Sequence, residues 1–142
     1  MKIRLLSDLH LEFESDHGDS FVDSLDPTGC DLVVLAGDVS THDHIVPALR
    51  KFCAKFPFVL MVSGNHEFYG ADLDTFSDIR WTELPSNLHW FSDVHSTGFT
   101  RYPCTFSGAT LWFPRRERSW HRRKTITDFR AIKHADVQIP AE

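Results

Sequence analysis

Residues 59–70 read VLMVSGNHEFYG, an apolar run that stops abruptly in polar residues. The apolar half is typical of a strand buried in a core. A plain turn needs only one Gly or Asn, whereas here Gly64 is followed by Asn65, His66 and Glu67. Because these side chains can bind metals or protons, the end of this strand is a candidate functional site.

Two earlier segments have the same form. Lys2–Leu6 predicts a strand followed by SDLHLE at 7–12, and Asp31–Asp38 reads DLVVLAGD, a second buried strand. Between the second and third strands, the apolar residues of 43–56 recur at helical spacing. Strands that alternate with helices predict parallel βαβ units and therefore the α/β fold class.

The rest of the chain predicts further short elements. Residues 16–29 are polar with one short apolar stripe, which allows a helical turn or two. A helix that ends before Pro85, three short strands and a charged helical segment follow. In chain order these elements are Ala71–Leu84, Leu88–Phe91, Val94–Phe99, Cys104–Phe113 and Glu117–Ala135. Since no helix separates the last strands, we expect the sheet to continue in a different style from Leu88 onward.

The strand ends carry the chemistry. In open α/β sheets, sites form at the carboxyl ends of the strands. This rule places three loops together, namely 8–10, 37–38 and 64–66. We therefore expect one site built from three separate parts of the sequence.

Four side chains of these loops are candidate metal ligands. Asp8 and His10 point the same way if the chain is extended, so they offer a carboxylate and an imidazole to one ion. Asp38 has two oxygens that could bridge a pair of metals, and Asn65 offers a neutral carbonyl oxygen to the second ion. Oxygen and nitrogen ligands without a thiolate favour Mn, Fe or Zn.

His66 follows Asn65 directly, so its side chain should point away from the same ion. It could donate a proton to a leaving group or stabilise charge there. Two metals about 3.5–4 Å apart would activate water and neutralise the oxygens of a phosphate during in-line attack. The end of the third strand is therefore expected to deliver one metal ligand, Asn65, and one acid, His66.

Three motifs, SDLHLE, LAGDVS (35–40) and VSGNHEFYG (62–70), resemble the calcineurin-like metallophosphoesterases, in which DxH, GD and GNH[ED] occur in this order at similar spacing. FSGATLW (106–112) and TDFRAIK (127–133) also resemble that family. The resemblance implies a four-layer α/β/β/α sandwich with a dimetal centre that hydrolyses a phosphomonoester or a phosphodiester.

Residue by residue, the resemblance implies that Asp8, His10, Asp38 and Asn65 bind metal and that His66 is catalytic. Family members supply further ligands from a later His and a GHxH motif, which this sequence lacks. We therefore expect residues 1–142 to be one phosphoesterase domain, present as its N-terminal portion and truncated at the C-terminus. The first metal would keep three ligands, and the second would keep Asp38 and Asn65.

The composition of the chain limits the kinds of site and the cellular location that we expect. The net charge is −5, and Asp and Glu outnumber Lys and Arg before residue 111, which fits a cation site. Three cysteines without CxxC spacing predict neither a disulfide framework nor a zinc finger. We see no secretory signal and no segment long enough to span a membrane, so we expect a cytoplasmic protein.

Two other classes of function stay open. The first is a catalytically deficient fragment that binds metal or a partner. The second is a nucleic-acid-binding module that uses the run RRERSWHRRK at 115–124, although a solvated helix face is the favoured interpretation of that run. If the fold is incomplete, Leu111, Trp112 and Phe113 should form an exposed patch through which the sheet self-associates.

Individually, several of these residues also have ordinary explanations. Asp8 and Asp38 could be loop carboxylates, and Asn65 after Gly64 is a turn signal. Glu67 and Tyr69 could support the site or only pack the loop. The combination of motifs, rather than any one residue, carries the prediction.

Overall fold

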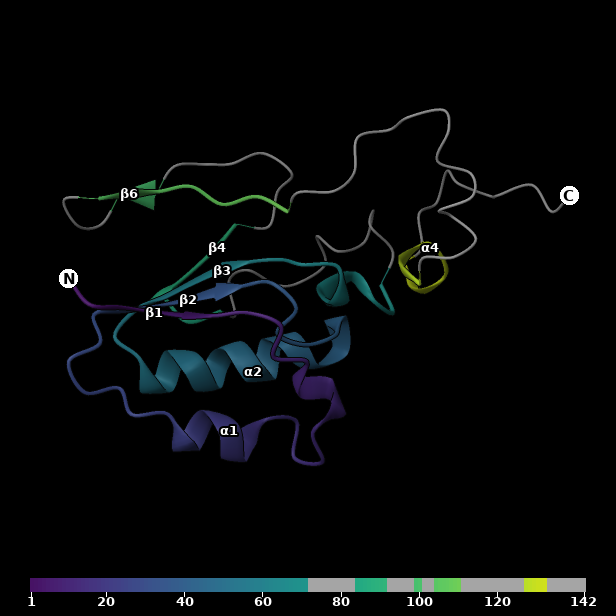
Figure 1. Ribbon diagram of the computed structural model, residues 1–142, viewed down its shortest axis with the longest axis horizontal. Coiled ribbons are helices and arrows are strands. Elements are labelled where there is room, and N and C mark those ends of the chain that lie inside the picture. The colour runs from purple at the N-terminus through teal and green to yellow at the C-terminus, as the bar shows by residue number, and fades with distance from the viewer. Residues whose placement is uncertain (72–83, 92–98, 101–103, 111–126, 133–142) are drawn as a thin grey trace, which may run out of the picture.

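The computed structural model describes residues 1–71, 84–91, 99–100, 104–110 and 127–132. Its centre is a four-stranded parallel sheet in the order β1-β2-β3-β4, which is also the chain order. The strands are β1 (Ile3–Leu6), β2 (Leu32–Ala36), β3 (Val59–Val62) and β4 (Leu88–Phe91). The α/β class and the three N-terminal strands predicted from sequence are confirmed (Figure 1).

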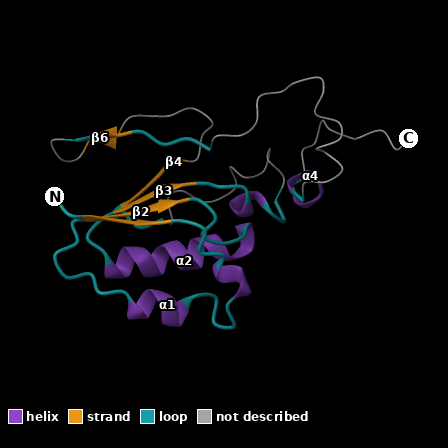
Figure 2. Ribbon diagram, in the orientation of Figure 1, coloured by secondary structure: helices purple, strands orange, loops and turns teal. Residues whose placement is uncertain are grey.

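Two helices cover one face of this sheet (Figure 2). They are α1 (Asp19–Ser24) and α2 (His42–Lys55). The apolar stripe predicted for α2 is buried, including Ile45, Leu49 and Phe52, each with no exposed area. It packs with the helix-facing residues of β2 and β3 into the larger core cluster. The strands are nearly continuous apolar runs because, in the middle of the sheet, both faces are covered.

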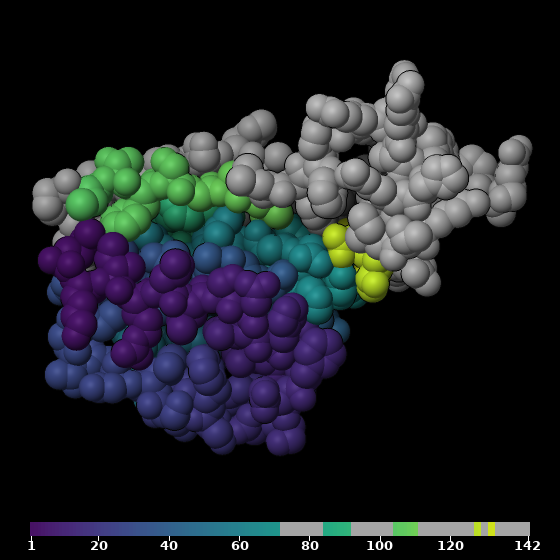
Figure 3. Space-filling model, viewed as in Figure 1, coloured from purple at the N-terminus to yellow at the C-terminus, as the bar shows by residue number. Residues whose placement is uncertain are grey.

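The opposite face carries a small second layer. The strands β5 (Phe99–Thr100) and β6 (Thr105–Phe106) form an antiparallel pair, and Phe106 packs on a second core cluster made by Leu32, Phe58, Leu60 and Phe91. Residues 104–110 are the green chain on that side of the sheet (Figures 1 and 3). The described residues therefore contain a helical layer, the parallel sheet and part of a further β layer.

The later elements agree with the predictions only in part. β4 pairs in parallel with β3, so the change of style comes after β4 and not at Leu88. The strand expected over Cys104–Phe113 is confirmed only as the short strand β6, which ends at Phe106, whereas the described residues 107–110 are not in a strand. Beyond it, Gly108 lies against the Phe91 ring, where an added Cβ would come within 2.9 Å of Cδ2, and Thr110 Oγ1 donates to the Ser63 carbonyl at 2.6 Å.

Several predicted features lie outside the described residues. These are most of the Ala71–Leu84 helix, the patch of Leu111, Trp112 and Phe113, and the basic run 115–124. From the last charged segment the structure describes α4 (Asp128–Ala131). Among the described residues, the exposed large apolar side chains are Met1, Ile3, Leu5 and Phe13.

Candidate metal and catalytic site

The loops after β1 and β2 lie side by side beyond the ends of their strands. The backbone N–H of Asp8 donates to the Gly37 carbonyl at 3.1 Å, and that of His10 donates to the Asp38 carbonyl at 3.0 Å. Leu11 continues the series by donating to Val39 at 2.9 Å. This pairing brings the SDLHLE and LAGDVS segments together at the carboxyl edge of the sheet, as strand order predicted.

Three of the predicted ligands have left-handed backbones. The φ angles are 54° at Asp8, 48° at His10 and 53° at Asp38. The expectation of an extended chain over residues 8–10 is therefore wrong, because the loop curls to keep pairing with the β2 loop. Left-handed non-glycine residues cost of order 1–3 kcal/mol each and gather at functional sites. The described chain has four such residues, the other being His17.

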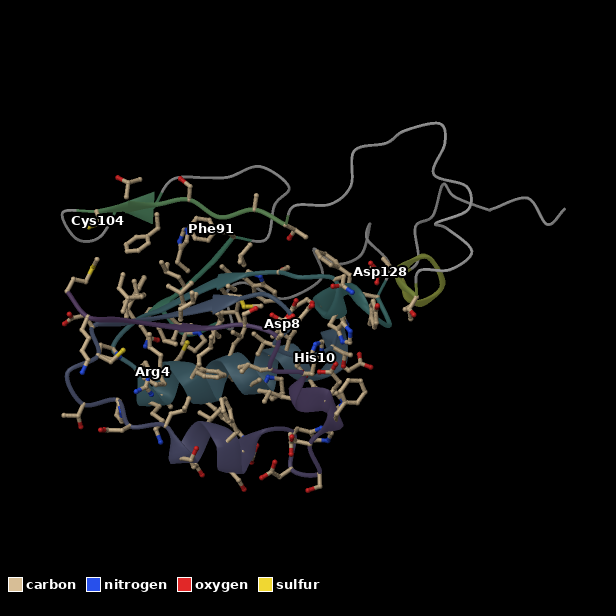
Figure 4. The ribbon with its side chains drawn as sticks, in the orientation of Figure 1. Arg4, Asp8, His10, Phe91, Cys104 and Asp128 are labelled. Carbon is tan, nitrogen blue, oxygen red and sulfur yellow. The ribbon has the colours of Figure 1, made fainter. Side chains whose placement is uncertain are left out.

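Despite this difference, the side chains of Asp8, His10 and Asp38 converge. One potential ligand atom from each lies within 4.8 Å of the others. Figure 4 shows Asp8 and His10 together where β1 ends. Two carboxylates and an imidazole are a donor set that suits Mn, Fe or Zn, so the residues present fit a divalent cation.

Two glycines allow the β2 and β3 loops to approach closely. A Cβ on Gly37 would lie 2.9 Å from the Gly64 backbone nitrogen, and one on Gly64 would lie 2.7 Å from the Asp38 nitrogen. Gly37 also has a φ of 86°, which side chains disfavour. The glycines before Asp38 and Asn65 are therefore required by the packing of backbone on backbone.

The buried side chain of Glu67 bonds to the backbone of both the β2 loop and the β3 loop. Its side chain has no exposed area. Oε1 accepts the N–H groups of Val39 at 2.6 Å and Ser40 at 3.4 Å, and Oε2 accepts those of Asp38 at 3.1 Å and Gly64 at 2.6 Å. Burial raises the pKa of Glu67, against the opposing effect of these backbone donors. Of the two interpretations left open for Glu67, structural support of the loops fits these contacts.

Asn65 is oriented by a partner from the far end of the chain. Its Nδ2 donates to Asp128 Oδ1 at 2.8 Å and lies 3.1 Å from Tyr69 Oη, which also donates to Asp128 at 2.6 Å. A carboxylate only accepts, so this contact assigns the amide nitrogen to Asp128 and leaves the amide oxygen for another partner. Burial and the Asp128 contact raise the pKa of Tyr69 to about 12.

His66 lies between these groups and the β1 loop. Its backbone N–H donates to Asp38 Oδ1 at 2.9 Å. Its ring stacks on Tyr69 with centroids 4.3 Å apart, and its Nδ1 lies 2.6 Å from Glu12 Oε1 and 3.2 Å from His10 Nδ1. His66 thus lies beside Asp38 and His10, two of the three side chains that converge at this site.

Sequence reasoning did not give roles to Glu12 and Asp128. Both stand inside quoted segments, SDLHLE and TDFRAIK, so the signal was a carboxylate within a motif. Spacing alone could not pair Glu12 with His66 or Asp128 with Asn65, because these contacts join residues 54 and 63 positions apart.

With this geometry established, comparison with known proteins gives the class. The chain belongs to the calcineurin-like phosphoesterase family, whose sequence profile (Metallophos) matches residues 1–140. This match confirms the family resemblance predicted from sequence. The members of this family are hydrolases that generally use divalent metals.

One solved structure that shares this fold is a hydrolase. The chain is similar to the crystal structure of phosphopantetheinyl hydrolase (PptH) from Mycobacterium tuberculosis, with a TM-score of 0.64 and 17% sequence identity. The match covers 96% of this chain and 56% of that one, so the chain spans little more than half the length of this relative. At this identity the likeness shows the fold. No curated protein sequence matches significantly.

Within the part of the chain that the structure describes, no helix combines the length and apolar character needed to cross a bilayer.

Proposed function

We propose that this chain carries residues of a dinuclear metal centre that hydrolyses a phosphomonoester or phosphodiester. The convergence of Asp8, His10 and Asp38 within 4.8 Å is the observation that carries the proposal. Asp38 and the Asn65 amide oxygen would hold the second ion. Divalent cations, when bound, neutralise phosphate oxygens and lower the pKa of water.

The chain's own residues would hold the metal ligands in place and protonate the leaving group of the ester. Asp38 and Asn65 come from loops that Glu67 fixes to each other, so their relative placement is set by the backbone. His66 lies beside them and would place a proton on the leaving-group oxygen, or stabilise its charge. The relative named for the phosphopantetheinyl group supports an ester substrate, and the ester class is as far as this proposal extends.

Calorimetric titration with Mn²⁺ tests the proposal. Asp38→Ala should lose the binding that the unsubstituted chain shows, because both ions would share Asp38. Asp23→Ala is the matched control, since Asp23 is an exposed acid on α1. Unchanged Mn²⁺ binding in Asp38→Ala would refute the metal site.

Turnover is measured on p-nitrophenyl phosphate and bis-p-nitrophenyl phosphate with Mn²⁺, Fe²⁺ or Zn²⁺ present. Activity that Asp38→Ala abolishes supports the phosphoesterase. Metal binding without turnover of either ester would support the catalytically deficient fragment instead.

A further inference from the structure

We propose that Phe13 makes this site selective for phosphate esters whose organic group is apolar or aromatic. The inference rests on the proposed function, because it names the class of ester that the same site would take. Phe13 is the last residue of the short helix η1 (Leu11–Phe13), which follows the β1 loop. It is neither a predicted metal ligand nor a predicted proton donor.

The described residues expose four large apolar side chains, and Phe13 is the one that lies beside the site. The other three belong to the N-terminus and to β1, namely Met1, Ile3 and Leu5. The Phe13 side chain is 77% exposed, and its ring centroid lies 6.0 Å from that of His10 and 6.3 Å from that of His66. Both distances are within the range of ring contacts, so an apolar surface stands next to both imidazoles.

The backbone of η1 holds Phe13 in this place. The N–H of Phe13 donates to the His10 carbonyl at 3.0 Å, and that of Glu14 donates to the Leu11 carbonyl at 3.2 Å. Leu11 anchors the turn, since its side chain is 2% exposed and a Cβ on Gly18 would lie 2.6 Å from its Cδ2. None of these contacts uses the Phe13 ring, so the turn itself does not require an aromatic residue at this position.

A single exposed phenylalanine is common on protein surfaces, so the location of the ring carries the argument. The side chains that converge next to it are polar, namely Asp8, His10 and Asp38. They would hold the charged phosphate, and the organic group of the ester would extend past them. Ligand sites usually combine a few polar groups that fix orientation with apolar side chains. An aryl or other apolar group on the Phe13 ring would remove apolar area from water, whereas a small polar alcohol would not.

Calorimetry of two phosphonates with the Mn²⁺-loaded chain tests this preference without turnover. Methylphosphonate and 2-naphthylphosphonate share the phosphonate group and differ in apolar area. An aromatic contact contributes about 2–10-fold in affinity, so the naphthyl compound should bind the unsubstituted chain more tightly by about that factor. The preference should disappear in Phe13→Ala and persist in Phe13→Trp. Leu5→Ala, which removes an apolar side chain that is 67% exposed on β1, is the control and should keep it.

The outcomes separate this inference from the proposed function. If the loaded chain binds both phosphonates equally, or if Phe13→Ala keeps the full preference, Phe13 does not select the ester, while the phosphoesterase proposal stands. If the chain binds no Mn²⁺, or binds it but neither phosphonate, the proposed function fails and this inference fails with it.

Steady-state kinetics on p-nitrophenyl phosphate gives a second measure. A contact with the organic group is the same before and during the reaction, so its loss appears in KM and not in kcat. Phe13→Ala should therefore raise KM about 2–10-fold, and Leu5→Ala should not. A lower kcat at the original KM would overturn the proposal, because Phe13 would then act on the reacting groups and not on the organic group.

Discussion

Truncation of Glu67 should be the most damaging single change at the site. In Glu67→Ala, the N–H groups of Val39, Asp38 and Gly64, now bonded at 2.6, 3.1 and 2.6 Å, lose their acceptor. Each orphaned donor costs about 1–3 kcal/mol, and water can reach some of them at the loop surface. We therefore expect a loss of about 3–5 kcal/mol, a large share of the roughly 5–15 kcal/mol of a typical domain.

Glu67→Gln should lie between Glu67→Ala and the unsubstituted chain. The amide keeps one oxygen, but its NH₂ group would face two backbone donors wherever it is placed. Urea unfolding followed by far-UV circular dichroism measures both variants. Glu14→Ala, an exposed acid in the neighbouring loop, is the control and should change stability by less than about 0.5 kcal/mol. If Glu67→Ala is as stable as that control, Glu67 does not hold the loops together.

Three further outcomes are expected. His66→Asn should keep Mn²⁺ bound and lose about 10²–10⁴-fold in kcat on alkyl phosphates but little on p-nitrophenyl phosphate; equal losses on both would reject the acid role. Asp128→Ala should weaken Mn²⁺ binding about 10-fold, because Asn65 is then free to rotate; calorimetry showing unchanged affinity would contradict this. Burial raises the pKa of Cys53 from 9.0 to about 12, so the folded state keeps a proton that the unfolded state loses, and stability should fall as pH rises from about 9 to 12. Cys53→Ala should lack that slope in pH-dependent urea unfolding; the same slope in both chains would show another group to be responsible.

Sequence alone could locate the site because its loops follow directly from strands. The apolar runs before Gly37 and Gly64 are unambiguous, and parallel pairing then forces the loops of Asp8, Asp38 and Asn65 to one edge. Strand identity and order were sufficient for that conclusion. The ligand roles themselves remain proposals.

The features that the sequence did not predict depend on backbone conformation or on contacts between residues far apart in the chain. The left-handed conformations of Asp8, His10 and Asp38 arise from pairing between two loops, which no local propensity encodes. The close approach of Gly108 to the Phe91 ring joins residues from two separate strands' ends and also has no local signal. Likewise, a carboxylate in a motif does not reveal its partner when the partner lies half the chain away, as for Asp128 and Asn65.

The strand order of the sheet also has a consequence for how the chain folds during synthesis. Because β1, β2, β3 and β4 are neighbours in the order in which they are made, each new strand can add to an edge that already exists. The two loops that carry Asp8, His10 and Asp38 can therefore pair before β3 has been made. The bond from Asn65 to Asp128 spans 63 positions, so it can form only after Asp128 has been made. On a ribosome that adds about 5–20 residues per second, several seconds would pass between the synthesis of Asp38 and that of Asp128, the residue that orients Asn65.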